Sequence, residues 1–272
     1  MPSDKPEYAL LDRPEVLRAI FHPRAEWGAP SLADEETAPR ITVAPDTHIG
    51  TRFHVVAGAR ATILFFHGNG EIALDYDELG TLYNQIGINF LVTDYRGYGR
   101  SSGQPTVSAM MGDCHAILAY VRRWLADHRE IHPLIVMGRS LGSASALELA
   151  AAHPEQMDGL IVESGFAYAE PLLGLLGVNV ERLGFKEEQG FGNLDKIRRY
   201  AGPTLIIHAE YDDIIPFRDG QALYEASGAA HKRLLRIEGA NHNDIFARGL
   251  SSYMQAVHDL AAHIRGAYPL PR

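Results

Sequence analysis

Short, continuous runs of apolar and β-branched residues alternate with segments of helical period along most of this chain. Such a run is typical of a strand buried on both faces, and its alternation with helices indicates repeated βαβ units. The sequence therefore predicts an α/β fold with a mostly parallel central sheet and helices on both of its faces. Strands are expected at residues 63–66, 88–93, 134–137, 160–162, 204–207 and 232–237, and helices at residues 71–85, 106–128, 141–152, 218–226 and 245–264.

Residues 1–45 do not follow this alternation. They are rich in Pro and Glu with few periodic apolar positions, and are expected to form an N-terminal extension with a short helix at 10–20 and a loop from 28 to 39. The remaining residues, 46–272, have a length that suits a single α/β domain.

A second irregular segment, residues 165–200, is longer than a normal crossover between two strands. Its stretch Leu172-Leu173-Gly174-Leu175-Leu176 is apolar and interrupted by glycine. Two interpretations stay open: an elongated crossover with one extra helix, or a small cap over a pocket. The position fits a cap, because ligands of such sheets bind at the carboxyl ends of the strands, where this insertion begins.

Charge and cysteine content exclude several classes of protein. The formal net charge is -9 and no Lys/Arg cluster stands out, which argues against binding to nucleic acid or to an anionic membrane. The single cysteine, Cys114, cannot form a disulfide within the chain. No secretory leader is visible at the start and no apolar run is long enough to cross a bilayer, so a soluble, cytoplasmic protein is expected.

The segment Gly138-Arg139-Ser140-Leu141-Gly142 matches the pattern Gly-x-Ser-x-Gly. The pattern alone is weak, but here it follows a predicted buried strand and opens an Ala-rich predicted helix. A strand-to-helix turn of this kind is the setting of a nucleophile elbow, where a serine hydroxyl stands above the sheet. Ser140 is therefore the candidate nucleophile.

A serine hydroxyl needs a base to remove its proton, and a histidine oriented by a carboxylate is the usual arrangement. Downstream of Ser140, first an acid and then a histidine come just after the ends of predicted strands, at the same edge of the sheet as Ser140. His242 is the candidate base. Asp212 is preferred as the acid, Asp213 is its neighbour and alternative, and Glu163, at the end of another strand, is a third option.

The other histidines are given lesser roles. His67 ends a strand on the active edge, where its backbone position matters more than its imidazole, and His208 is expected to support the acid loop. The remaining histidines, His22 among them, are interpreted as surface or packing residues. No histidine pair has convincing zinc spacing with a third ligand, so no metal site is expected.

Two backbone N–H groups are candidates to stabilise the oxyanion of a tetrahedral intermediate. One belongs to Leu141, the residue after the nucleophile, and the other to Asn69 in the glycine-rich loop His67-Gly68-Asn69-Gly70 after the first buried strand. The glycines allow this loop to turn its N–H groups inward.

Five stretches together resemble the α/β-hydrolase superfamily, and within it the Bem46-like and ABHD-like serine hydrolases, over about residues 48–265. The resemblance implies the α/β-hydrolase fold, and it supports Asp212 as the acid because Ile215-Pro216 follows it in the family register. Two departures are Ala209, where the family often has glycine, and Glu163 near the edge of the pocket. Arg96 and Tyr98 are interpreted as residues that fix their loop. The stretches are His67-Gly68-Asn69-Gly70-Glu71, residues 94–103, Gly138-Arg139-Ser140-Leu141-Gly142, residues 208–216 and residues 239–242.

The predicted function is that of a carboxylesterase-like serine hydrolase that cleaves a small acyl ester or thioester through Ser140, His242 and Asp212. No cofactor is required, and the expected partner is a small-molecule ester. Two alternatives stay open: a serine peptidase or amidase of the same fold, and a binding protein without catalysis. The fold does not determine the substrate, and nothing in the sequence indicates the oligomeric state.

Overall fold

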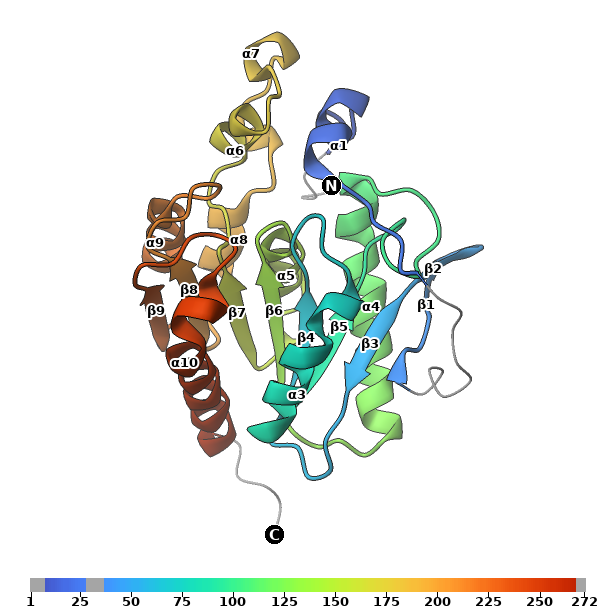
Figure 1. Cartoon of the computed structure of the whole chain (residues 1–272), viewed down its shortest axis with the longest axis vertical. Helices are drawn as coiled ribbons and strands as arrows, with labels where there is room; N and C mark the ends of the chain where they lie inside the picture. The colour runs from blue at the N-terminus through green and yellow to red at the C-terminus, as the bar shows by residue number, and fades with distance from the viewer. Residues whose placement is uncertain (1–7, 28–36, 268–272) are drawn as a thin grey trace.

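The computed structural model describes residues 8–27 and 37–267. Within these residues the main sheet has seven strands in the order β3-β5-β4-β6-β7-β8-β9 (Figure 1). All neighbouring pairs are parallel except β3 with β5, as predicted for a mostly parallel sheet. The strands are β3 (Thr51–His54), β4 (Ala61–Phe66), β5 (Ile88–Thr93), β6 (Leu134–Arg139), β7 (Gly159–Glu163), β8 (Thr204–Ala209) and β9 (Lys232–Ile237).

Helices pack on both faces of this sheet, and each face has its own apolar core. Alternate side chains of β4 point to opposite faces: Ile63 and Phe65 join one core, and Leu64 and Phe66 the other. Helices α3 (Asp77–Gln85) and α10 (Ile245–Ala267) cover one face, in front of the sheet in Figure 1. The opposite face is covered by α4 (Val107–Asp127), α5 (Gly142–Ala152), α8 (Asn193–Arg199) and α9 (Phe217–Ala226).

The predicted strands and helices are all present, with ends that differ by a few residues. The helix predicted at 71–85 begins only at 73 and divides into the 3-10 turn η1 (Ala73–Tyr76) and α3. Thr106 caps α4, because its hydroxyl accepts the backbone N–H of Ala109 at 3.0 Å.

The N-terminal region holds more structure than the sequence predicts. Helix α1 (Pro14–Ile20) is the expected short helix, and its Val16 and Ile20 are buried. Strands β1 (Ile41–Ala44) and β2 (Thr47–Ile49) form an antiparallel pair, and β3 adds the antiparallel edge of the main sheet. These three strands were not predicted, because each has only three or four residues and none contains a continuous apolar run. The loop predicted from 28 to 39 lies outside the described residues, apart from its last three.

The insertion at 165–200 contains four short helical segments. They are α6 (Ala169–Leu175), α7 (Val180–Leu183), the 3-10 turn η3 (Glu187–Gln189) and α8. In Figure 1, α6 and α7 extend above the carboxyl ends of the strands, with α1 across from them. The segment is therefore more than a single crossover helix, and its first part lies over the edge of the sheet where the predicted site residues lie.

The order of the strands places a crevice at this edge. The chain passes from β4 to β5 on one side, then crosses back to β6 on the other side of β4. Ligands of open α/β sheets bind at such a reversal, outside the carboxyl ends of the strands. No helix in the described ranges is both long and apolar enough to cross a membrane.

Candidate active site

Ser140 lies on a sharp turn between β6 and α5. Its φ of 50° is in the left-handed region, which residues other than glycine rarely adopt, so this backbone is strained. A Cβ on Gly138 would overlap the backbone of Gly142, and a Cβ on Gly142 would overlap the carbonyl of Phe66. The two glycines therefore allow the turn to close tightly against the end of β4, as a nucleophile elbow requires.

The side chains of Ser140, His242 and Asp212 form one hydrogen-bonded chain. Nε2 of His242 lies 3.1 Å from Oγ of Ser140, and Nδ1 lies 2.8 Å from Oδ2 of Asp212. The other oxygen of Asp212 accepts the backbone N–H groups of Ile214 at 3.1 Å and Ile215 at 2.7 Å. Because an ionised carboxylate can only accept, Nδ1 carries the ring proton and Nε2 presents its lone pair to the hydroxyl.

The surroundings of Asp212 favour its ionised form. Burial by itself would raise the pKa of this carboxyl, but the hydrogen bond and charge of His242, with the Ile215 N–H group, hold the pKa below its usual range. The stabilisation from this carboxylate is present above its unfolded-state pKa and is lost as pH falls through the folded-state pKa. At neutral pH the group can therefore orient His242 and stabilise its imidazolium form.

The two alternative acids do not contact His242. Asp213 is exposed. Glu163 is fully buried beneath the elbow, where one oxygen accepts Nη1 of Arg139 at 2.8 Å and the other accepts the Tyr253 hydroxyl at 2.7 Å. Of the three carboxylates that the sequence offered, only Asp212 is placed to orient the histidine.

His208 lies beneath the acid loop. Its Nε2 donates to the carbonyl of Ile215 at 2.8 Å and lies 3.6 Å from Oδ2 of Asp212. Burial lowers the pKa of the His208 imidazole, which favours its neutral form. This position fits a support for the acid loop and not a base.

The residues of the two candidate oxyanion donors, Asn69 and Leu141, line the same pocket as Ser140. Among the described residues neither backbone N–H has a hydrogen-bond acceptor. The N–H of the neighbouring Gly68 is occupied, since it donates to Oε2 of Glu71 at 2.6 Å. Two unpaired donors at one end of a pocket can receive the negative oxygen of a tetrahedral intermediate.

The oxyanion loop, residues 67–71, rests on a buried polar cluster. His67 is fully buried, and Nε2 of its ring lies 3.2 Å from Oδ1 of Asp94. The backbone carbonyl of His67 accepts the Tyr95 hydroxyl at 2.6 Å. Burial opposes the charged imidazolium, but the hydrogen bond and charge of Asp94 raise the pKa of His67 above its usual value. Both contacts fix the start of the loop.

Arg139, at the first variable position of the elbow motif, connects three parts of the site. Its guanidinium donates to Oε1 of Glu71 at 3.0 Å, to Oε1 of Glu163 at 2.8 Å and to the carbonyl of His242 at 2.9 Å. Glu71 in turn accepts the Gly68 N–H of the oxyanion loop. The network therefore joins the elbow, the oxyanion loop and the histidine loop.

The charged groups of this network, Arg139 and its carboxylate partners, stabilise one another. Burial alone would raise the pKa of the Glu71 carboxyl, but the Arg139 charge and the Tyr76 hydroxyl hold it below the usual range. The pKa of Arg139 is raised by the two carboxylates despite burial. Neither Arg139 nor Glu71 was predicted from the sequence as a residue of the site. For Arg139, a signal was available in the sequence: a charged residue stands between a buried strand and the candidate nucleophile.

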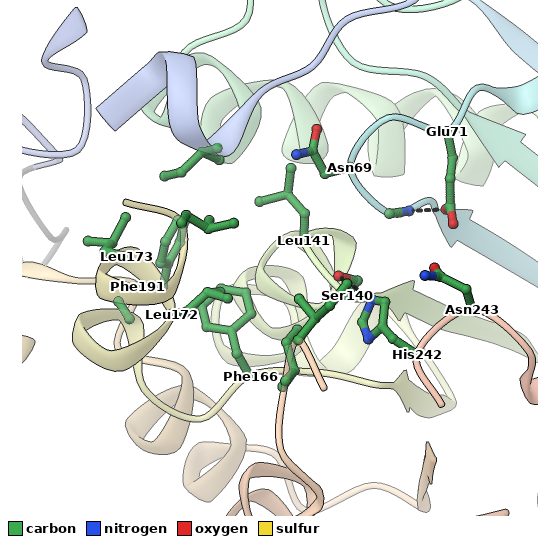
Figure 2. A pocket seen from close by; sticks show the side chains of 16 residues that line it. Asn69, Glu71, Ser140, Leu141, Phe166, Leu172, Leu173, Phe191, His242 and Asn243 are labelled. Atoms are coloured by element: carbon green, nitrogen blue, oxygen red, sulfur yellow. Dashed lines mark hydrogen bonds between the residues drawn. The ribbon is translucent and has the colours of Figure 1, made fainter. Parts of the chain in front are cut away.

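The pocket at Ser140 has a volume of about 170 Å³. Figure 2 shows apolar side chains on one side of Ser140, and Glu71 and Asn243 on the other. The apolar side is formed by α1, by the insertion and by the acid loop, and its residues are Ile20, Phe166, Ala169, Leu172, Leu173, Leu176, Phe191, Ile214 and Ile215. No group of His, Cys, Asp and Glu side chains in residues 8–27 and 37–267 is arranged to hold a metal ion.

A mostly parallel sheet with a serine on a strand-to-helix elbow is the architecture of an α/β hydrolase. A family model described as serine aminopeptidase S33 matches residues 57–183. The human α/β hydrolase domain-containing protein 17B is 34% identical over 260 residues, which cover 90% of this chain and 83% of that protein. The chain therefore belongs to the α/β-hydrolase superfamily, in the family of the α/β hydrolase domain-containing 17 proteins, and it is a hydrolase of that fold.

Solved structures agree with this fold. An esterase from Pyrococcus furiosus superposes with a TM-score of 0.70 at 18% identity, covering 90% of this chain and all of that one (100%). A monoacylglycerol lipase from Paleococcus ferrophilus has a TM-score of 0.61 at 18% identity, covering 80% of this chain and 99% of that one. The predicted fold class is confirmed.

Proposed function

We propose that the chain is a serine esterase that cleaves carboxylic ester or thioester bonds of small acyl substrates. The observation that carries the proposal is the hydrogen-bonded chain from Ser140 through His242 to Asp212, which ends beside two unpaired backbone donors. A cytoplasmic location and independence of any cofactor stay predictions from the sequence.

In the proposed reaction, Oγ of Ser140 attacks the acyl carbonyl while Nε2 of His242 takes the hydroxyl proton. The carbonyl oxygen becomes negative and accepts the N–H groups of Asn69 and Leu141. Collapse of this intermediate expels the alcohol or thiol, which receives the proton from His242. Water, deprotonated by the same nitrogen, then releases the acid and restores Ser140, while Asp212 stabilises the imidazolium in both steps.

The residues of the pocket favour an ester substrate over the peptide substrate of an aminopeptidase. An aminopeptidase needs an acidic group to receive the substrate's free ammonium. Glu71 is the only acid among the described pocket residues, and its oxygens are already occupied by Gly68, Tyr76 and Arg139. An amide also requires protonation of a poorer leaving group. We therefore propose the ester reaction, with a peptidase or amidase as the competing assignment.

A fluorophosphonate probe tests the proposed reaction directly. The wild-type chain should be labelled covalently at Ser140, because the activated hydroxyl attacks phosphorus as it would attack a carbonyl. The Ser140→Ala variant should not be labelled, and intact-protein mass spectrometry measures both. An unlabelled wild type would favour a binding protein, and labelling without ester turnover would favour the peptidase or amidase assignment.

Because one side of the pocket is apolar, we expect kcat/KM to rise with acyl length in a series of p-nitrophenyl esters with short acyl chains. Each methylene that becomes buried should raise kcat/KM by about fourfold, from roughly 0.8 kcal/mol of transfer free energy, until the pocket is full. Leu172→Ala should weaken this dependence because Leu172 lines the pocket. Leu175→Ala on the same helix is the control, since Leu175 is 58% exposed and outside this pocket. Identical rates across the wild-type series would contradict an apolar acyl pocket.

A further inference from the structure

Residues 21–27, which follow α1, run directly over the oxyanion loop. Figure 2 shows Asn69 below the chain that leaves α1, in the roof of the pocket. Ile20, at the end of α1, lines that pocket, and Ala25 forms a parallel bridge with Gly99. Nε of Arg24 donates to the carbonyl of Gly70 at 3.3 Å. A segment outside the matched family model therefore contacts the candidate active site at several points.

His22 in this segment binds the side chain of Asn69 at both ends of its amide. The backbone N–H of His22 donates to Oδ1 of Asn69 at 2.9 Å, and Nδ1 of the His22 ring lies 2.7 Å from Nδ2. A backbone N–H can only donate, so the amide atom that faces it is the oxygen. Nδ2 is therefore the donor, and Nδ1 of His22 is an unprotonated acceptor.

The Asn69 side chain depends mainly on His22 for its hydrogen bonds. In the described residues its amide makes three hydrogen bonds, two with His22 and one with the Tyr98 hydroxyl at 2.8 Å. Its own backbone N–H is unpaired, and the next residue is Gly70 at a φ of 75°. The carbonyl of the peptide that carries the Asn69 N–H, which is that of Gly68, lies 2.8 Å from Nδ1 of His67. The His22 bonds therefore act on the other side of this peptide, where they hold the Asn69 side chain and with it the direction of the Asn69 N–H.

We propose that His22 is a positioning residue for the oxyanion hole: through the Asn69 amide it holds the Asn69 backbone N–H toward the substrate oxygen. This inference rests on the proposed esterase function. His22 does not touch the reacting atoms, so its removal should affect the transition state, where the oxygen is negative, more than the binding of the neutral ester.

Three variants separate this role from a general effect on folding. His22→Phe keeps a planar ring but removes the acceptor. His22→Asn places Oδ1 where Nδ1 stood, so it can still accept from Asn69. Arg18→Ala is the control in the neighbouring helix α1, because Arg18 is exposed and makes no hydrogen bond with the loop in the described residues. Titration with a fluorophosphonate counts the active sites in each preparation.

The readouts are kcat and KM for p-nitrophenyl butyrate, and the Ki of butylboronic acid, whose adduct with serine carries a negative oxygen. We expect His22→Phe to lower kcat about tenfold per active site and to raise Ki by a similar factor, with KM little changed. His22→Asn should stay within about twofold of wild type, as should Arg18→Ala.

Each outcome decides one question. An unchanged kcat and Ki in His22→Phe would overturn the inference while leaving the esterase proposal intact. A loss of active sites with a normal kcat and Ki per site would also overturn it, because His22 would then act only in folding. A wild type that neither reacts with the probe nor hydrolyses esters would overturn the proposed function, and this inference with it.

Discussion

Replacing Asp212 with asparagine is expected to lower kcat for ester hydrolysis by about 10⁴-fold, without loss of the fold. Oδ1 of Asp212 accepts two backbone N–H groups, from Ile214 and Ile215. In the variant the amide oxygen must keep that position, because an amide nitrogen cannot accept. The amide nitrogen then faces Nδ1 of His242 as a donor. Nδ1 must release its proton, so Nε2 becomes protonated and can no longer act as the base for Ser140.

Asp213→Asn is the matched control, one residue away. Asp213 is exposed and forms no bond to His242, so this variant should keep kcat within about twofold of wild type. Steady-state kinetics on a p-nitrophenyl ester and a thermal melt of each variant provide the measurements. A large loss in Asp213→Asn with a normal Asp212→Asn would show that the acid had been assigned to the wrong residue.

The sequence predicted the sheet and the three hydrogen-bonded side chains because both leave local signals. Buried parallel strands such as β4 and β6 are continuous apolar runs, and their carboxyl ends share one edge of the sheet. The residues that follow these ends are therefore brought together by topology alone. Ser140 lies at the end of β6 and Asp212 follows β8, which are both fully buried, while His242 follows β9, the less buried strand at the edge of the sheet. Their meeting could therefore be predicted from strand order.

What the sequence did not predict are contacts between distant segments. His22 was interpreted as a surface or packing residue, because nothing near it in sequence indicates that its partner is Asn69, 47 residues away. Arg139 similarly finds Glu71 across 68 residues and the His242 carbonyl across 103. A side chain that supports a neighbouring loop carries no periodic or motif signal of its own, so these roles required coordinates.

Replacing Arg139 with methionine is expected to lower the free energy of unfolding by about 3–5 kcal/mol. Arg139 is 6% exposed and Glu163 is fully buried, so the variant leaves a buried carboxylate without its cation. The Tyr253 hydroxyl would be the remaining donor to that carboxylate. Urea denaturation followed by tryptophan fluorescence measures the change. Arg233→Met is the control: its ion pair with Asp259 is exposed, so its loss should cost less than about 1 kcal/mol.

A second substitution distinguishes stability from positioning in the same network. In Arg139→Met with Glu163→Gln, the buried charge is removed and the new amide oxygen can still accept the Tyr253 hydroxyl, so most of the lost stability should return. The carbonyl of His242 and the oxygen of Glu71 would still lack their guanidinium donor. We therefore expect kcat to stay about ten- to a hundredfold below wild type. Recovery of kcat together with stability would contradict a role for Arg139 in holding the histidine and oxyanion loops.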